Sequence, residues 1–190
     1  MAKRRIQSKN KWKSKVWYQL TAPGDFGEAV VGETPADDPQ KVIGRMVSVP
    51  ARELTGNSRQ NNQSLLLKVT KVAGTTAKTD LAGYEVMRTY LRSIVRRRKE
   101  KLDLVQDVQT KDDVKIRVKS VIITANKAHD EQGRGLVRLL KETIEQEAKA
   151  NELGAFIRKV MEMGPQQAVK EAARKLVPVT HVEIRKIEIL

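Results

Sequence analysis

The chain of 190 residues carries 37 Lys and Arg against 23 Asp and Glu, a formal net charge of +14, and its hydrophobic fraction of 39% is enough for one folded core. It has no cysteine, which excludes disulfides, thiolate nucleophiles and cysteine metal sites. Its apolar runs are too short to span a bilayer, and no apolar segment follows the basic N-terminus as in a secretory signal, so we expect a soluble intracellular protein without membrane contact.

The first fifteen residues form a basic arm, and no acidic residue occurs within the first twenty. A segment with this much charge cannot bury enough apolar surface to fold alone. We therefore expect residues 1–15 to be disordered when free and ordered against a polyanion. A solubilising tail is the simpler alternative, but it does not explain Trp12, on which a base can stack. The candidate nucleic-acid-binding residues of the arm are Lys3, Arg4, Arg5, Lys9, Lys11, Trp12, Lys13 and Lys15.

With the seven cations of the arm set aside, 30 basic residues remain against 23 acidic ones, so the body, residues 16–190, keeps a charge of +7. We expect this body to be a single α+β domain. Its first half is rich in β-branched and alternating segments, which predict strands. In chain order these are strands at 16–20 and 27–31, an acidic Pro-rich loop at 32–40, a strand at 41–49, a polar loop at 55–64 and a strand at 65–72.

From Tyr84 the apolar residues follow helical spacing, which predicts a helix carrying a second basic cluster. Three arginines of the cluster recur at i+4 and therefore share one stripe, although like charges at this spacing repel. The helix dipole accounts for cations at the last turn only, so the row favours contact with RNA or DNA phosphates over a merely solvated face. The cluster comprises Arg88, Arg92, Arg96, Arg97, Arg98 and Lys99.

A hairpin is predicted next, with strands at 102–110 and 114–125 and a tight turn at 111–113. In its second strand Lys115, Arg117 and Lys119 alternate with apolar residues and so share one face of the sheet. This face is the third candidate RNA contact. Exposed strand faces are commonly charged in any protein, so the alternative of a solvated face stays open.

Three helices are predicted after Gly133, with apolar stripes at 136–148, 153–161 and 168–176. Asn151 is the expected N-cap of the second helix, and Gly164-Pro165 separates the second from the third. In the last strand the apolar residues change from even positions (Val182, Ile184) to odd positions (Ile187, Ile189) across Arg185-Lys186, which predicts a β-bulge. Together these elements predict an α+β fold with a mostly antiparallel, β-barrel-like core of about six or seven strands, helices packed outside it, and the basic N-terminal arm.

Catalytic signals are poor. The only histidines, His129 and His181, have no companion residues spaced as in a metal or hydrolase site, and no nucleotide-loop, nucleophile-elbow or zinc-protease motif occurs. The segment 133–135 (Gly-Arg-Gly) precedes a predicted helix and could meet a phosphate, but a three-residue match is weak. We therefore expect no enzyme, no cofactor, no metal site and no small-molecule substrate.

The chain resembles the S-three-Ae (e-S-one) family of small-subunit ribosomal proteins, from Lys11-Trp12 to the C-terminus. The segments that carry the resemblance agree in order and spacing. They are Lys11-Trp12, Phe26-Gly27, Leu91–Arg98 (LRSIVRRR), Asp107–Ser120 (DVQTKDDVKIRVKS), Ile157–Gly164 (IRKVMEMG) and Leu176–Leu190 (LVPVTHVEIRKIEIL). Eukaryotic members continue past the final strand with a basic extension that this chain lacks, so the resemblance favours an archaeal-type member.

The resemblance implies a barrel-like core and a structural place in the small (30S) ribosomal subunit of the cytoplasm, on the platform near the 3′ end of the small-subunit rRNA and the mRNA exit. The implied partners are that rRNA and neighbouring platform proteins, and further mRNA and initiation factors; the arm from Lys3 to Lys15 matches the family's rRNA-binding arm by position. The alternative is a free-standing adaptor that binds RNA or translation factors.

Overall fold

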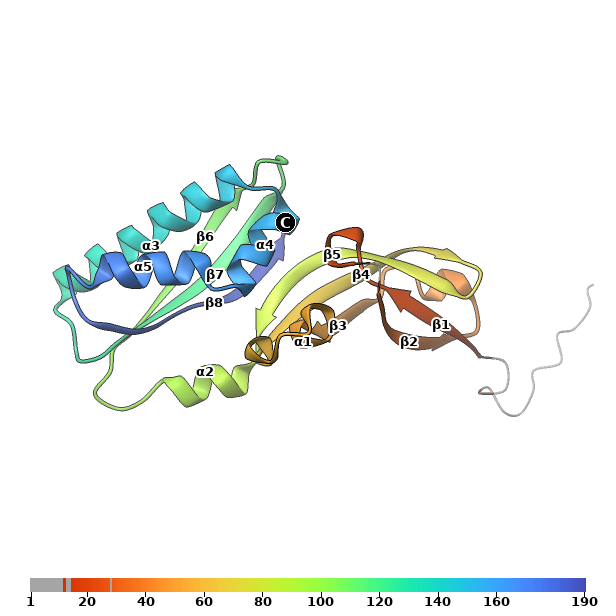
Figure 1. Cartoon of the computed structure of the whole chain (residues 1–190), viewed down its shortest axis with the longest axis horizontal. Helices are drawn as coiled ribbons and strands as arrows, with labels where there is room; N and C mark the ends of the chain where they lie inside the picture. Colours follow the sequence, from red (N-terminus) through yellow and green to blue (C-terminus); the bar gives the residue numbers. More distant parts are fainter. Residues whose placement is uncertain (1–11, 13–14, 28) are drawn as a thin grey trace, which may run out of the picture. The chain divides into compact units, whose positions relative to one another are not determined.

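The computed structural model describes residue 12, residues 15–27 and residues 29–190, which form eight β-strands and five α-helices (Figure 1). The predicted mixed α+β class is confirmed. The described chain falls into two compact units. The first unit comprises the described residues up to Val47 together with Leu67–Leu81, and the second comprises Ser48–Leu66 and Ala82–Leu190.

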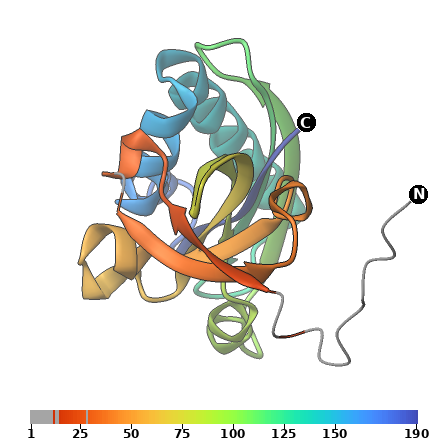
Figure 2. The ribbon, with the colours of Figure 1, turned by 90° about the vertical axis from the view of Figure 1, so that its right-hand side faces the viewer.

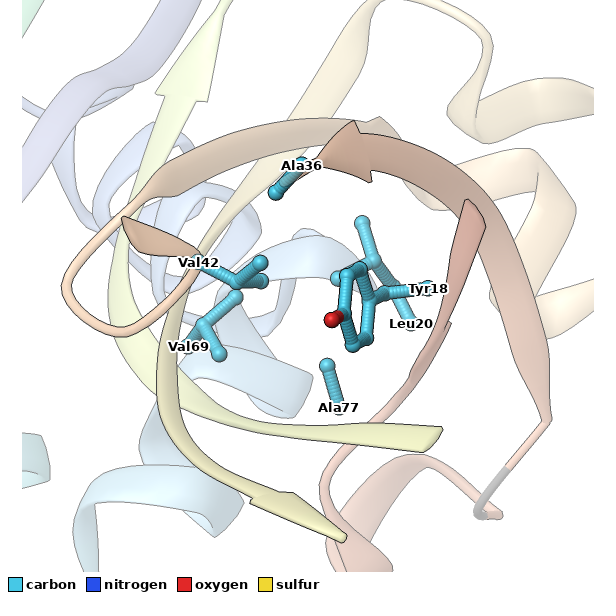
Figure 3. Packing of buried hydrophobic residues seen from close by; sticks show 6 residues of the cluster. All are labelled: Tyr18, Leu20, Ala36, Val42, Val69 and Ala77. Carbon is cyan, nitrogen blue, oxygen red and sulfur yellow. The ribbon is translucent and has the colours of Figure 1, made fainter. Parts of the chain in front are cut away.

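The first unit is built from strands. Strand β1 pairs antiparallel with β2 and parallel with β5, and β4 pairs with β3 and β5. Six buried side chains from these strands and the turn before β3 point into one interior, where Tyr18 and Leu20 lie opposite Val42 and Val69 (Figure 3). The elements are β1 (Val16–Thr21), η1 (Gly24–Phe26), β2 (Val30–Ala36), η2 (Pro39–Lys41), and parts of β3 (Met46–Pro50), β4 (Gln63–Ala73) and β5 (Thr76–Val86), three strands that continue into the second unit.

The second unit is a sheet with helices. Strand β7 pairs antiparallel with β6 and β8, and β8 pairs antiparallel with β5. Helix α3 packs on β6 and α5 packs on β8, and α3, α4 and α5 lie together on one face of these strands (Figures 1 and 2). The remaining elements are α1 (Ala51–Thr55), η3 (Ser58–Gln60), α2 (Arg88–Ile94), β6 (Lys101–Gln109), β7 (Lys115–Thr124), α3 (Asp130–Ala150), α4 (Leu153–Met161), α5 (Gly164–Ala173) and β8 (Val179–Ile189).

Strand β7 carries two different surfaces on one face. Lys115, Arg117 and Lys119 share a parity with Val121 and Ile123, because side chains alternate along a strand. The last two are buried under Ile94, Leu91 and Tyr90 of α2. The face is therefore cationic at its beginning and apolar where α2 covers it.

Several predictions of local structure are confirmed. The hairpin β6–β7 has its turn at the predicted residues, where Thr110 N–H donates to Val114 O at 3.1 Å and Asp113 takes a positive φ of 60°. The parity change in β8 is a bulge: Lys119 pairs with Lys186 and Ser120 with Ile184, which leaves Arg185 as the extra residue. The stripe of α3 is buried at Leu136, Leu140, Ile144 and Ala148.

One strand, β5, was not predicted. The sequence predicted a helix from Tyr84, but Tyr84 is buried within β5 opposite Ile187 of β8, and α2 begins only at Arg88. The spacing of Tyr84 to Met87 and Leu91 matches a helix by coincidence, and pairing with a strand distant in the sequence decides the structure. The described residues consequently hold eight strands rather than six or seven.

The predicted barrel is not confirmed. The strand order is β2-β1-β5-β8-β7-β6, with β3 and β4 joined through β5, and no pairing among the described residues joins β6 back to β2. The sheet is therefore not closed.

Boundaries in the first half were also partly wrong. The segment predicted as an acidic loop contributes Gly32–Ala36 to β2. Lys41 ends η2, and residues 42–44 form a turn rather than a strand, with Gly44 at φ 84°. Pro35 is tolerated in β2 because this strand ends the sheet path and lacks a second neighbour among the described residues.

Among the helices, Asn151 is not the N-cap of α4 but ends α3, where its Nδ2 donates to the Glu147 carbonyl oxygen at 2.7 Å. The segment 133–135 lies inside α3, so it cannot present a helix N-terminus to a phosphate. The predicted stripe of α5 is wrong in part, since Ala168 and Ala172 are exposed and Leu176 lies beyond the helix and is exposed as well. The buried residues of α5 are Pro165, Gln166, Val169 and Ala173.

Candidate nucleic-acid interface

A basic pocket of about 420 Å³ lies in the second unit between α2, β7 and the bulge of β8. Its lining contains five cations and one carboxylate, Glu85. Such a hollow concentrates positive potential, which favours a polyanion. The five cations are Arg88, Arg92, Lys119, Arg185 and Lys186.

The bulge supplies two of these cations. In a regular strand, neighbouring side chains point to opposite faces, but the extra residue of a bulge changes this alternation. Arg185 and Lys186 both line the pocket beside Lys119, the partner of Lys186 across the sheet. The sequence predicted the bulge but did not nominate its two cations for RNA contact, although the parity change was the signal that could have found them.

The two lysines of the pocket both form ion pairs with Glu188. Lys119 Nζ lies 2.7 Å from Glu188 Oε2, and Lys186 Nζ lies 2.9 Å from Glu188 Oε1. The hydrogen bonds from Lys119 and Lys186 lower the pKa of Glu188 to about 2. Arg88, Arg92 and Arg185 form no ion pair within the part of the chain that the structure describes, so their guanidinium groups are the ones available to an anion.

The structure brings Arg88 and Arg92 together on α2, as predicted, but not the rest of that cluster. Helix α2 ends at Ile94, Val95 is extended, and Arg98 has a φ of 68°. Arg96, Arg97, Arg98 and Lys99 therefore lie in a turn before β6 and not on the predicted helical stripe. Arg96, Arg97 and Arg98 are all exposed, so a helix continued through them would bury no apolar surface. It would also place Arg96 one turn beyond Arg92, where the two like charges repel.

The cationic face of β7 forms as predicted, with Ile116 and Val118 buried on the opposite side. Arg117 binds Asp107 of β6 through two hydrogen bonds, Nε to Oδ1 at 2.7 Å and Nη2 to Oδ2 at 2.8 Å, and this lowers the pKa of Asp107. Lys119 belongs to the basic pocket and Lys115 is exposed. Ion pairing therefore offsets part of the charge that this face was expected to offer.

Most of the predicted arm lies outside the described residues, namely Lys3, Arg4, Arg5, Lys9, Lys11 and Lys13. Of the arm, Trp12 and Lys15 are described. The Trp12 side chain is 65% exposed, and Lys15 Nζ lies 3.7 Å from the centroid of its ring. This is a cation–π contact that leaves much of the indole accessible.

No group of three or more His, Asp or Glu side chains among the described residues is placed to hold a metal ion. His129 stands directly before α3, where its backbone N–H donates to Gln132 Oε1 at 3.2 Å, and His181 is half-buried in β8. Burial, followed by the charges of Lys170 and Lys99, lowers the pKa of His181. None of the described helices combines the length and the apolarity needed to cross a bilayer.

Comparison with known proteins defines the class. The chain belongs, over residues 3–190, to the family described as the Ribosomal S3Ae family, a family of structural ribosomal proteins and not of enzymes. It is similar to the small ribosomal subunit protein eS1 of Methanopyrus kandleri, at 38% identity over 96% of this chain and 88% of that protein. The eS1 protein of Archaeoglobus fulgidus is 40% identical over 99% of this chain and 90% of that protein. That of Desulfurococcus amylolyticus is 34% identical over 100% and 89%. The expectation of an archaeal-type member is confirmed.

Proposed function

We propose that this protein is a structural component of the small ribosomal subunit in the cytoplasm, where it binds small-subunit rRNA on the platform near the rRNA 3′ end and the mRNA exit. The observation that carries the RNA contact is the basic pocket, which gathers Arg88 and Arg92 with Arg185 from a distant part of the sequence. Neighbouring platform proteins are its further partners, and mRNA and initiation factors lie within reach of that position.

The pocket suits a phosphate-bearing strand better than an acidic protein surface. Its arginines have planar, forked donor groups that match phosphate oxygens, and they are not engaged by carboxylates among the described residues. Each phosphate that they neutralise releases condensed counterions, which makes affinity fall steeply with salt. The arm, from Lys3 to Lys15 with Trp12, adds a second contact of the same kind.

The test measures the affinity of the purified chain for its small-subunit rRNA over a range of salt concentrations. The double variant Arg88→Ala/Arg92→Ala should reduce the slope of log K against log salt by roughly 1.4–1.8, the value for two phosphate contacts. Deleting residues 1–15 should flatten the slope further. An unchanged slope in both variants would refute RNA binding by these segments.

The matched control is Arg134→Ala/Arg138→Ala on α3, which removes the same charge at the same spacing. These two arginines and Lys141 lie in a hollow with four carboxylates, Glu100, Asp130, Glu142 and Glu145, so its formal net charge is −1 rather than positive. This variant should leave the slope nearly unchanged. A sucrose gradient tests the alternative of a free-standing adaptor. Sedimentation with the 30S peak would exclude the adaptor, and sedimentation away from that peak would support it.

A further inference from the structure

The second unit contains another cavity, of about 290 Å³, beside α2. Tyr90 of α2 lines this cavity, whereas Arg88 and Arg92 line the basic pocket. Residues two apart on a helix lie about 200° apart around its axis, so the two hollows occupy opposite flanks of the same short helix. Val86, two residues before Arg88, lines both hollows, so they adjoin at the start of α2, and a strand held at the arginines can reach this cavity there.

The cavity contains a buried amide whose hydrogen-bonding capacity is not used. Gln63, at the beginning of β4, is 7% exposed and lines the cavity. Its Oε1 accepts no hydrogen bond among the described residues, and its Nε2 has only a long contact of 3.8 Å to Met163 Sδ. A buried acceptor without a donor costs free energy, so this amide is set to gain from a ligand that supplies both a donor and an acceptor.

The remaining walls combine apolar side chains with neutral amides and two carboxyl groups, those of Glu162 and Glu183. Met161, Met163 and Val86 contribute apolar surface, and no Lys or Arg lines the cavity. Glu183 is 3% exposed, accepts a hydrogen bond from the Tyr90 hydroxyl at 2.9 Å, and has its pKa raised by burial. A cavity without cations and with two carboxyl groups does not suit a phosphate, whereas its methionines and amides suit a flat, neutral ring with a polar edge.

We propose that this cavity receives one unstacked adenine of the RNA strand that the basic pocket holds, with the Gln63 amide reading its polar edge. Adenine presents an amino donor beside a ring-nitrogen acceptor, the pair that a glutamine amide complements in a bidentate contact. The methionines cover the faces of the ring, as apolar side chains do for bases taken out of a stack. The volume lies at the lower limit of small-ligand cavities, about 300 Å³, which favours a single base over a larger group.

This inference rests on the proposed function, because a base can enter the cavity only if RNA is bound at α2. The test uses the full chain bound to its small-subunit rRNA, with the variant Gln63→Leu. Replacing the unpaired amide by an apolar side chain of similar size should not lower the Tm, whereas it should weaken rRNA binding roughly tenfold, the scale of a lost bidentate base contact. Gln106→Leu is the matched control, since Gln106 is also 7% exposed and has both its amide atoms unpaired but lines neither this cavity nor the basic pocket.

Dimethyl sulfate mapping of the complex supplies a measurement that misfolding cannot imitate. The wild-type protein and Gln106→Leu should shield the N1 atom of one unpaired adenine, and Gln63→Leu should expose that adenine while the rest of the footprint persists. If all three proteins bind rRNA equally and shield the same adenines, the cavity holds no base, although the proposed function stands. If the wild-type protein shows no salt-dependent rRNA binding at all, it is the proposed function that fails.

Discussion

The side chain of Asp112, in the turn between β6 and β7, accepts a hydrogen bond at 3.1 Å from the backbone N–H of Leu153, the first residue of α4. The residue at the N-cap position of α4, Glu152, makes no side-chain cap hydrogen bond of its own. A residue 41 positions away in the sequence therefore satisfies one of the free N–H groups at this helix start. The hairpin turn thus helps to fix where α4 begins against the sheet.

Replacing Asp112 by Ala should therefore destabilise the protein although Asp112 is exposed. The expected loss is about 0.5–2 kcal/mol, the range for removing a capping side chain. Lys111→Ala is the control, because the hydrogen bond that Lys111 makes within the described part of the chain comes from its backbone N–H, which donates to the Asn151 carbonyl oxygen and is kept in the variant. Denaturant unfolding of both variants measures the difference, and equal midpoints would show that the contact from Asp112 adds no stability.

Glu188 forms ion pairs with two of the five cations in the basic pocket, so removing its charge should strengthen RNA binding. In Glu188→Gln the side chain keeps its shape but no longer pairs as an anion with Lys119 and Lys186, while Lys186 keeps its pair with Glu85 at 4.0 Å. We expect a higher affinity for small-subunit rRNA and a salt slope steeper by roughly 0.7–0.9, corresponding to one more neutralised phosphate.

The control for this variant is Glu145→Gln on α3, which removes the same charge from a carboxylate paired with Lys149 at 2.6 Å. It should leave the slope unchanged, because neither residue lines the basic pocket. Equal effects of the two variants would mean that net charge alone, and not the pocket, governs binding.

Glu183 gives the protein a pH dependence opposite in sign to that of Glu188. Burial raises the pKa of Glu183, so the folded state holds its proton more tightly than the unfolded state does. The stability associated with the neutral carboxyl is present below the ordinary pKa of about 4.5 and is lost as the pH rises through the raised value. The lowered pKa of Glu188 acts the other way, since its contribution is present above about 4.5 and is lost as the pH falls towards about 2.

The variant Glu183→Gln should therefore be more stable than the wild type at pH 7 and equal to it at pH 4. The neutral amide still accepts the hydrogen bond from Tyr90 without the cost of a buried charge. A gain of about 1 kcal/mol would raise the Tm by roughly 2–4 °C in a chain of this length. Thermal unfolding at the two pH values checks this, and a lower Tm of the variant at pH 7 would show that the charged carboxylate is stabilising.

The local features of this fold were predictable, and the site was predictable only in part. The residue types at Asp112-Asp113 predicted the hairpin turn, and the change in side-chain alternation at Arg185 predicted the bulge. Both are local signals. Strand β5 was missed although it pairs with β4, from which Gly74 and Thr75 separate it, so a local turn signal was present and was not used. The pairing of Gly83–Glu85 with β8, by contrast, is a long-range contact that no local window contains.

The basic pocket shows the same limit. Arg88 and Arg92 were nominated from their spacing on a helix, but the two cations of the bulge approach them only through the packing of α2 on β7 and the pairing of β7 with β8. Conversely, spacing alone extended the arginine row through Arg96, because it could not show that the helix ends at Ile94. Spacing identified the charges, and tertiary pairing decided which of them share a pocket.

Gly83 is the position where backbone packing tolerates no side chain. It lies in β5 directly beside β8, and a Cβ atom placed there would collide with the carbonyl oxygen of Ile187. That carbonyl is backbone and cannot rotate away, so Gly83→Ala must push the two strands apart. We expect a loss of about 1–3 kcal/mol, as for overpacking in a protein interior.

Gly135→Ala provides the comparison within the same unit. Its Cβ would meet only Leu176 Cδ1, at 3.6 Å, an ordinary contact, and Gly135 lies inside α3. Alanine there should stabilise the helix by about 0.8–1.0 kcal/mol. The two substitutions add the same methyl group, so the midpoints of chemical unfolding should move in opposite directions. A shift of both in the same direction would contradict the close approach of β5 to β8 at Gly83.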